Sequence, residues 1–245
     1  MSETGHAKNL ANFNELLSFV SAYDTDYKPA KASISLASLQ ILSNEARNAL
    51  ADLNVLNSAY RNAAIARELA FKPLNKLMTR VMNALKASDT PIQADENART
   101  LVRKIHGSRA KAKLTDEEKQ ILAAEGKEIR EISTSQLSFD NRLENFDKLI
   151  KLLSGFPLYA PNEPDLKVEG LSELYSNLML KNATAVTAFV PVSNARIARN
   201  TVFYKADTGL VDIALAVKAY IKSIFGATSP QYKQLGKLSF KSQKG

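Results

Sequence analysis

Cysteine and tryptophan are absent from the chain, and glycine and proline are scarce. Without cysteine the chain cannot form a disulfide, a zinc finger, an iron–sulfur cluster or a thiolate nucleophile. A cysteine-free chain fits a reducing compartment, so we expect a cytoplasmic protein. Nine glycines and eight prolines in 245 residues disfavour a turn-rich all-β fold and favour long helices.

Targeting and membrane-spanning patterns are also missing. The N-terminal stretch MSETGHAKNLANFNELL lacks the charged region and apolar run of a signal peptide. No window of 18 apolar residues exists, so we expect no transmembrane helix.

Apolar residues recur at helical spacing through most of the sequence, which predicts an all-α fold. The clearest predicted helices cover residues 9–22, 74–87 and 142–150. Another helix follows Ser88 and ends at His106 and Gly107, and a further one starts at Thr115. Residues 33–71 contain neither proline nor glycine, so they form one long helix or break at a point the pattern does not locate.

Two parts of the chain resemble each other at a nearly constant offset. RNAAIARE (61–68) matches SNARIARN (193–200) at five positions that lie 132 residues apart. NLANFNELL (9–17) matches RLENFDKLI (142–150), and YKP (27–29) matches YAP (159–161). These matches predict an internal duplication inside a single helical domain, residues 1–245, with two copies of about 80 residues packed in a pseudo-twofold helical bundle.

The boundaries of this duplication follow from the matches. Copy one spans residues 9–87, an unduplicated basic and acidic insert spans 88–141, copy two spans 142–224, and a basic C-terminal tail spans 225–245. Copy two carries Pro191 where copy one has Ala59. Because proline removes a helix hydrogen bond, we expect a kink or a break near residues 189–192.

The repeated string has a structural and a functional interpretation. In the structural one, which we favour, its alanines allow close helix packing, Ile65 and Ile197 supply apolar contacts, and the arginines bind carbonyls or a carboxylate. In the functional one, Arg67 and Arg199 lie near each other across the pseudo-twofold axis and form an anion site.

Positive charge is concentrated in two segments that more than account for the net charge of +8. The first contains Arg99, Arg103, Lys104, Arg109, Lys111 and Lys113, and the second is a tail, expected to be mobile, with Lys233, Lys237, Lys241 and Lys244. Such segments can neutralise phosphates and release counterions. Because no aromatic side chains are interleaved, we expect contacts to the phosphate backbone of a nucleic acid or ribonucleoprotein without base specificity. A solvated basic face remains the alternative.

Catalytic and metal-binding motifs are not found. The two histidines, His6 and His106, are distant in sequence, and the acid pairs Glu117 with Glu118 and Asp207 with Asp212 have no matching partner motif. We therefore expect no enzyme, no cofactor and no metal site. The apolar segment 210–227, with Lys218 and Lys222 along one side, fits a helix on a membrane surface or, as we favour, a helix of the core.

Several strings carry a resemblance to a known group of proteins. GHAKNLANFNELLSFVSAY, SFDNRLENFDKLIKLL, NARIARN and YKADTGLVDIALAVKAYIKSIFGATSPQYKQL resemble an uncharacterised all-helical cytoplasmic protein family of Bacteroidetes-type bacteria. The resemblance covers nearly the whole chain. It implies a bacterial helical protein and assigns no functional residue.

These observations predict a non-enzymatic, basic helical binding protein. Its partner would be an anionic macromolecule, either a nucleic acid or a ribonucleoprotein. The alternative is a structural scaffold that self-associates as a homo-oligomer through its helical faces and has no role with nucleic acid. A membrane partner is not expected.

Overall fold

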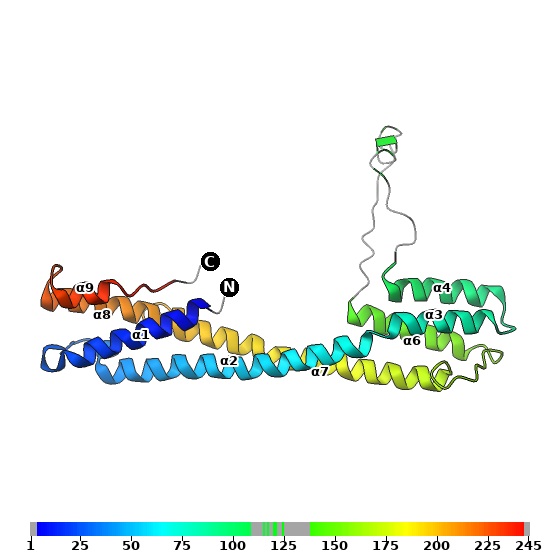
Figure 1. The fold of residues 1–245 in the computed structure, drawn as a ribbon, viewed down its shortest axis with the longest axis horizontal. Helices are drawn as coiled ribbons and strands as arrows, with labels where there is room; N and C mark the ends of the chain where they lie inside the picture. The colour runs from blue at the N-terminus through cyan, green and yellow to red at the C-terminus, as the bar shows by residue number, and fades with distance from the viewer. Residues whose placement is uncertain are drawn as a thin grey trace. The chain divides into compact units, whose positions relative to one another are not determined.

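The structure is a computed structural model that describes residues 4–108, 115, 117, 120, 121, 124 and 138–242. Among these residues every regular element is a helix, which confirms the predicted all-α class. The helices are α1 (Thr4–Ala22), η1 (Asp24–Asp26), η2 (Ala32–Ile34), α2 (Leu36–Phe71), α3 (Leu74–Lys86), α4 (Ile92–His106), α6 (Phe139–Ser154), α7 (Val168–Tyr204), α8 (Leu210–Phe225) and α9 (Pro230–Gly236), as labelled in Figure 1. The helix predicted from Thr115 lies almost entirely outside the described residues.

The chain divides into two compact units, each with its own apolar core. Unit 1 comprises Met1–Arg61 and Ala188–Gly245, and unit 2 comprises Asn62–Thr187. One core gathers side chains of α1, α8 and the unit 1 parts of α2 and α7, and the other gathers α3, α4, α6 and the unit 2 parts of the long helices. Each unit therefore takes elements from both predicted copies. The prediction of a single domain stays a prediction.

The long segment in copy one is a single helix, α2, with 36 residues, and α7 has 37. Three of the five buried residues of α2 and five of the seven of α7 recur every seven positions, as in helices that pair along a seam. On α2 these are Leu39, Ala46 and Leu53, and on α7 they are Leu171, Leu178, Ala185, Val192 and Arg199. Such a repeat keeps one stripe of each helix buried along its length, which favours a long continuous helix.

The structure bears on two local predictions about these helices. Helix α7 runs unbroken through Pro191, so of the predicted kink or break the break does not occur, and the kink stays a prediction. Pro191 is exposed, and the contacts on both sides of it hold the helix together despite the lost hydrogen bond. Ile65 and Ile197 do not supply packing contacts, because their side chains are 54% and 64% exposed.

In unit 2, α4 packs against both α3 and α6 (Figure 1). Helix α4 ends as the sequence predicted, at Gly107, whose φ of 70° lies in the left-handed region. The loop before α7 is held by Tyr159, whose hydroxyl donates to the Leu166 carbonyl oxygen at 2.8 Å. At the start of α7, Gly170 lies so close to Pro164 that an added Cβ would be 2.1 Å from the Pro164 oxygen.

In unit 1, α8 packs against both α1 and α9 (Figure 1). The loop between α1 and α2 is held by Tyr27, whose hydroxyl donates to the Ile34 carbonyl oxygen. Helix α8 buries six of its residues, including Ile213, Val217 and Ile221, so the favoured interpretation of segment 210–227 as a core helix fits unit 1. Among the described residues, no helix is both long enough and apolar enough to cross a membrane.

Candidate functional site

The basic residues predicted to bind phosphate begin on α4. Arg99 is exposed, whereas Arg103 and Lys104 are half-buried. Helix α4 carries Asp95 in its first turn and Arg103, Lys104 and His106 in its last turn, an order that stabilises the helix through its dipole. The cluster thus has a structural role that does not depend on a ligand. Arg109, Lys111 and Lys113 lie outside the described residues.

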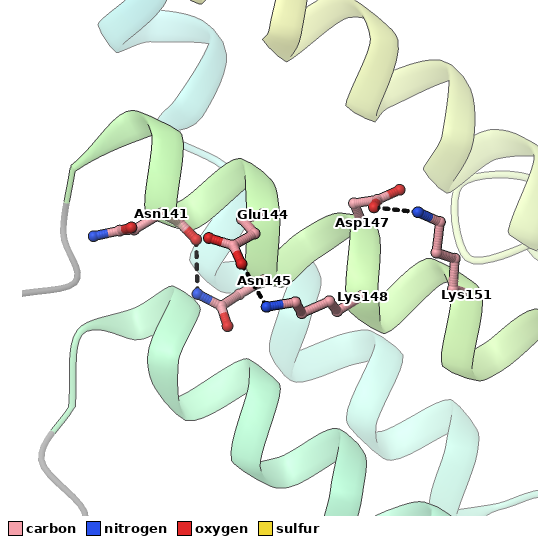
Figure 2. Close-up of polar contacts among 6 residues, drawn as sticks. All are labelled: Asn141, Glu144, Asn145, Asp147, Lys148 and Lys151. Atoms are coloured by element: carbon pink, nitrogen blue, oxygen red, sulfur yellow. Dashed lines mark hydrogen bonds and ion pairs between the residues drawn. The ribbon is translucent and has the colours of Figure 1, made fainter.

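Helix α6, which packs against α4, carries two ion pairs along its own length (Figure 2). Lys148 forms an ion pair with Glu144, and Lys151 binds Asp147 at 2.6 Å. The pKa of Glu144 is lowered chiefly by its hydrogen bond to Lys148 and also by the charge of Lys104. Lys104 is thus within electrostatic range of a carboxylate on α6, and Arg99 is the exposed α4 cation among the residues described.

A stack of two arginines and two phenylalanines fixes the start of α6. Arg67 on α2 lies 4.0 Å from the ring centre of Phe139, and Phe139 meets Phe71 edge to face at 4.8 Å. Arg142 lies over the other ring of this pair, 5.3 Å from the ring centre of Phe71. Stacking a guanidinium on an aromatic ring stabilises both, by about 0.5–2 kcal/mol.

Hydrogen bonds complete this cluster and join five helices, α2, α3, α4, α6 and α7. Arg67 donates to the Asn182 side-chain oxygen at 3.1 Å, and the Asn182 amide donates to Asp140 at 2.7 Å. Arg142 donates to the side-chain oxygen of Asn75 at 3.0 Å, and His106 lies 3.1 Å from the Asn75 carbonyl oxygen. Burial lowers the pKa of Arg142. The cluster therefore clamps the end of α4 and the start of α6 to the α2–α3 junction.

The two repeated arginines have partners within their own units. Arg67 belongs to unit 2, while Arg199 belongs to unit 1, where its Nε and Nη2 donate to the Asn200 side-chain oxygen at 3.2 and 2.9 Å. These contacts fit the structural interpretation of the string. The joint anion site of Arg67 and Arg199 stays a prediction.

The C-terminal lysines lie on a segment that is docked rather than mobile through Ser242, so the expected mobile tail is wrong for these residues. Lys233, Lys237 and Lys241 are exposed, and Lys244 lies outside the described residues. Lys218 on α8 donates to the Leu238 carbonyl oxygen and lies 5.4 Å from the ring centre of Phe240. Burial under this segment lowers the pKa of Lys218.

Two asparagines of α1 hold the same segment. The Asn9 amide donates to the Lys241 carbonyl oxygen, and the Lys241 backbone N–H donates back to the Asn9 side-chain oxygen, both at 2.9 Å. Asn12 donates to the Ser239 carbonyl oxygen at 2.6 Å. These contacts are not predictable from the sequence, because an asparagine on a helix gives no sign of which backbone group it binds. The repetition of Asn12 as Asn145 in both copies was the one available signal.

Two surface depressions flank an ion pair in unit 2. Arg80 binds both carboxylate oxygens of Asp165, which holds the pKa of that carboxyl below its usual value. The larger depression, about 580 Å³, is lined by Asn83, Asp89 and Glu163, and the smaller, about 360 Å³, by Leu77, Gly170 and Leu174. Unit 1 has a depression of about 260 Å³ lined by Ser38, Leu42 and Ile213. All three are open and mixed in polarity, and their residues do not form a catalytic set.

The structure shows the surroundings of most of the histidines and acid pairs that were considered as candidate catalytic or metal-binding residues. His6 is buried in unit 1 and His106 lies in unit 2. Asp212 accepts a hydrogen bond from the Asp207 backbone N–H, which fixes the turn before α8. Of the acid pair Glu117 and Glu118, only Glu117 is described. Within the described part of the chain, no three side chains of the metal-binding types gather as a potential metal site.

Comparisons with known proteins give no relative. No protein-family model matches the chain, and no significant match was found among the curated proteins or the solved structures.

Proposed function

We propose that the chain is a non-enzymatic helical protein that arose by internal duplication and acts by binding other macromolecules, first of all a second copy of itself. The duplication is supported by recurring contacts. Tyr27 and Tyr159, 132 residues apart, each donate to the carbonyl oxygen seven residues later. Two aromatic contacts, Phe203 with His6 and Phe71 with Phe139, recur at offsets of 132 and 133.

Depressions at matching places support the same proposal. The one lined by Ser38, Leu42 and Ile213 in unit 1 corresponds to the one lined by Gly170, Leu174 and Leu77 in unit 2. The long helices bury Leu39 and Leu171, which also lie 132 residues apart. A pseudo-twofold relation between the copies, a cytoplasmic location and a bacterial family remain parts of the proposal.

Exposed apolar side chains on α7 carry the proposal of self-association. In unit 2, Met179 and Val186 are seven residues apart and are 49% and 53% exposed. In unit 1, Val190 and Ile197 are seven residues apart and are 53% and 64% exposed. Because residues seven apart share one face of a helix, each pair makes an apolar strip on the surface. Exposed apolar strips are typical of protein interfaces.

A second copy is the partner that these strips fit best. From Leu174 to Ala206 the chain contains no acidic residue, so this part of α7 offers no carboxylate to a basic partner. The seven-residue spacing equals that of the buried seam, which is the spacing that helix pairing requires. Ile65 on α2 and Ile197 on α7 are exposed at matching places of the two copies. In a twofold dimer, one such apolar face packs against the same face of the second chain.

Sedimentation of the wild type and two matched variants tests this function. The wild type should exceed the monomer mass of 26.9 kDa at tens of micromolar. Val190→Lys with Ile197→Lys should return it to monomer, since burying two lysines costs several kcal/mol. Leu215→Lys is the control, because Leu215 is 52% exposed in the same unit but lies on α8. A wild type that stays monomeric, or a control that dissociates equally, contradicts the proposal.

Binding of an anionic macromolecule is the second candidate, favoured by four exposed cations. These are Arg99 on α4 and Lys233, Lys237 and Lys241 near the C-terminus. Contacts to phosphates would be independent of base sequence and would weaken steeply with salt. The partner would be DNA, RNA or a ribonucleoprotein.

A salt titration with random duplex DNA and single-stranded RNA separates this candidate from self-association. Binding should be detectable at low salt, and each phosphate contact removed should reduce the salt slope by about 0.7–0.9. Arg99→Gln tests the α4 site, and Lys233→Gln with Lys237→Gln tests the C-terminal site. Absence of binding at low salt excludes the candidate and leaves self-association as the proposed function.

A further inference from the structure

Helix α2 carries an exposed stripe without charge in its unit 1 part, on the side away from the core. The stripe positions follow one another three or four residues apart and are Ile41, Asn44, Asn48, Ala51, Val55 and Ser58. All are exposed, with Ile41 at 59% and Val55 at 70%. The buried residues Leu39, Ala46 and Leu53 precede three of them by two positions, about 200° around the helix. The stripe is therefore left uncovered by unit 1.

This stripe has the composition of a helix-pairing seam rather than that of a face in water. The solvent face of a helix is normally rich in charged residues, whereas the stripe has none, and asparagine is a weak helix former. Spacings of three and four that combine apolar side chains with an occasional asparagine are the pattern along which two helices pair as a coiled coil. Ile41, Asn48 and Val55 then take the first core position of each heptad, and the other three residues take the second.

Two helices that meet along this stripe match best when they run parallel and in register. Each core residue then lies opposite the same residue of the second copy, so apolar side chains meet apolar ones. The two Asn48 amides can donate to each other and accept from each other. An antiparallel pair centred on the stripe would instead bury Asn48 against Ala51 and Asn44 against Val55, which leaves buried amides without partners.

The charges beside the stripe favour the same direction. Arg47 lies on one flank, Glu45 and Asp52 lie on the other, and all three side chains are exposed. Within the described part of the chain, none of the three belongs to an ion pair. In a parallel pair, Arg47 lies opposite Asp52 of the second copy, and the twofold symmetry forms this ion pair twice. In an antiparallel pair, Glu45 would lie beside Asp52 of the second copy, and the two carboxylates would repel each other.

We infer that the stripe of residues 41–58 on α2 binds the same stripe of a second copy, with the two α2 helices parallel and in register. The inference rests on the proposed self-association and adds a face separate from the strips of α7. Because asparagine in a pairing seam lowers stability, the α2 contact is weaker than the contact through the apolar strips. A copy that uses both faces can associate beyond a pair at higher concentration.

Single cysteines in this cysteine-free chain test the direction of the pair. Asn48→Cys and Val55→Cys, made separately, each place a thiol opposite its own twin in a parallel pair, where the Cα atoms are close enough for a disulfide. Under mild oxidation each variant should form a covalent dimer at least about tenfold faster than Leu215→Cys, because pairing raises the effective concentration of the thiols. Leu215 is the control, since it is 52% exposed on α8 of the same unit.

Charge reversal in the Val55→Cys background tests the ion pair between copies. Arg47→Glu should slow disulfide formation by about two- to fivefold, and so should Asp52→Arg, because each change brings like charges together. The double variant with Arg47→Glu and Asp52→Arg forms the pair again with its signs exchanged and should restore the rate. A double variant that is as slow as the single ones overturns the parallel register.

Sedimentation of the wild type separates a failure of this inference from a failure of the proposed function. If the wild type associates but neither cysteine variant links faster than Leu215→Cys, self-association uses other faces and the α2 contact is wrong. A link at only one of the two positions also overturns the inference, because an antiparallel pair brings at most one of them to its own twin. If the wild type stays monomeric and linking equals the control, both the proposed self-association and the α2 contact are wrong.

Discussion

At the scale of single residues, the loops before the long helices depend on close contacts to the backbone. Gly170 leaves no room for a side chain, since a Cβ would be 2.1 Å from the Pro164 oxygen. Gly170→Ala should therefore lower the free energy of unfolding by about 1–3 kcal/mol, the usual cost of forcing atoms into a filled space. Thermal or urea unfolding measures this loss.

Gly236 provides the control for that substitution. A Cβ there would have no heavy atom within 4 Å, and the residue ends helix α9. Gly236→Ala should leave stability unchanged or raise it slightly, because alanine is the better helix former. If the two variants behave alike, the contact between Gly170 and Pro164 does not restrict the loop.

Tyr159 makes the second residue-scale prediction. Tyr159→Phe removes the hydrogen bond to the buried Leu166 carbonyl oxygen and should cost about 1–2 kcal/mol near neutral pH. Burial raises the pKa of Tyr159 to about 12, so its folded state keeps the proton more tightly than the unfolded chain. The stability it contributes is present below pH 10 and is lost as the pH rises from about 10 to 12.

Unfolding free energies at pH 8 and pH 11.5 check both parts. The difference between the wild type and Tyr159→Phe should shrink at the higher pH. Tyr27→Phe, the matching variant in unit 1, should behave in the same direction, because Tyr27 donates to Ile34 and its pKa is also raised by burial. A difference that is independent of pH would contradict the role assigned to the hydroxyl proton.

At the scale of elements, helix α7 contains a proline, Pro191, in its interior. Pro191 is exposed inside an unbroken helix, and its counterpart in copy one, Ala59, is exposed on α2. Pro191→Ala should restore a backbone hydrogen bond and raise the free energy of unfolding, by at most about 3 kcal/mol. The reciprocal variant Ala59→Pro should lower it by a similar amount. Urea unfolding of both variants checks this, and a destabilised Pro191→Ala would show that the proline is structurally required.

The sequence predicted most helices because their signals are local. The α3 pattern, the left-handed Gly107 after α4 and the absence of proline and glycine from α2 all depend on neighbouring residues. Of the kink or break predicted at Pro191, the break does not occur. Val192 beside the proline is fully buried, and the burial of a helical side chain depends on the tertiary structure rather than on its sequence neighbours.

The candidate sites were less predictable than the helices. The density of positive charge in the sequence identified the basic end of α4. It did not reveal that the charge of Lys104 acts on the Glu144 carboxylate of α6. The repetition of the string NARIARN was visible in the sequence. Its Ile197 was expected to pack against other side chains, but it is exposed. Contacts such as Asn9 with Lys241 join residues 232 positions apart, and neither residue type predicts the other.

At the scale of the whole molecule, the two units differ in which parts of the chain form them. Unit 2 is a continuous stretch, Asn62–Thr187, whereas unit 1 needs both ends of the chain. The C-terminal segment closes unit 1 through buried Leu238 and through bonds to Asn9, Asn12 and Lys218. Removing this segment should therefore loosen one unit and leave the other intact.

Truncation after Lys237 tests this independence by hydrogen exchange. Amide protection in α1 and α8 should fall by about tenfold or more, since the loss of about 1.4 kcal/mol of local stability gives a tenfold change in opening. Protection in α3, α4 and α6 should stay the same, because their core contains no residue of the removed segment. A uniform loss of protection in both units would mean that they unfold as one cooperative body, whereas unchanged protection in α1 and α8 would mean that the segment contributes nothing to unit 1.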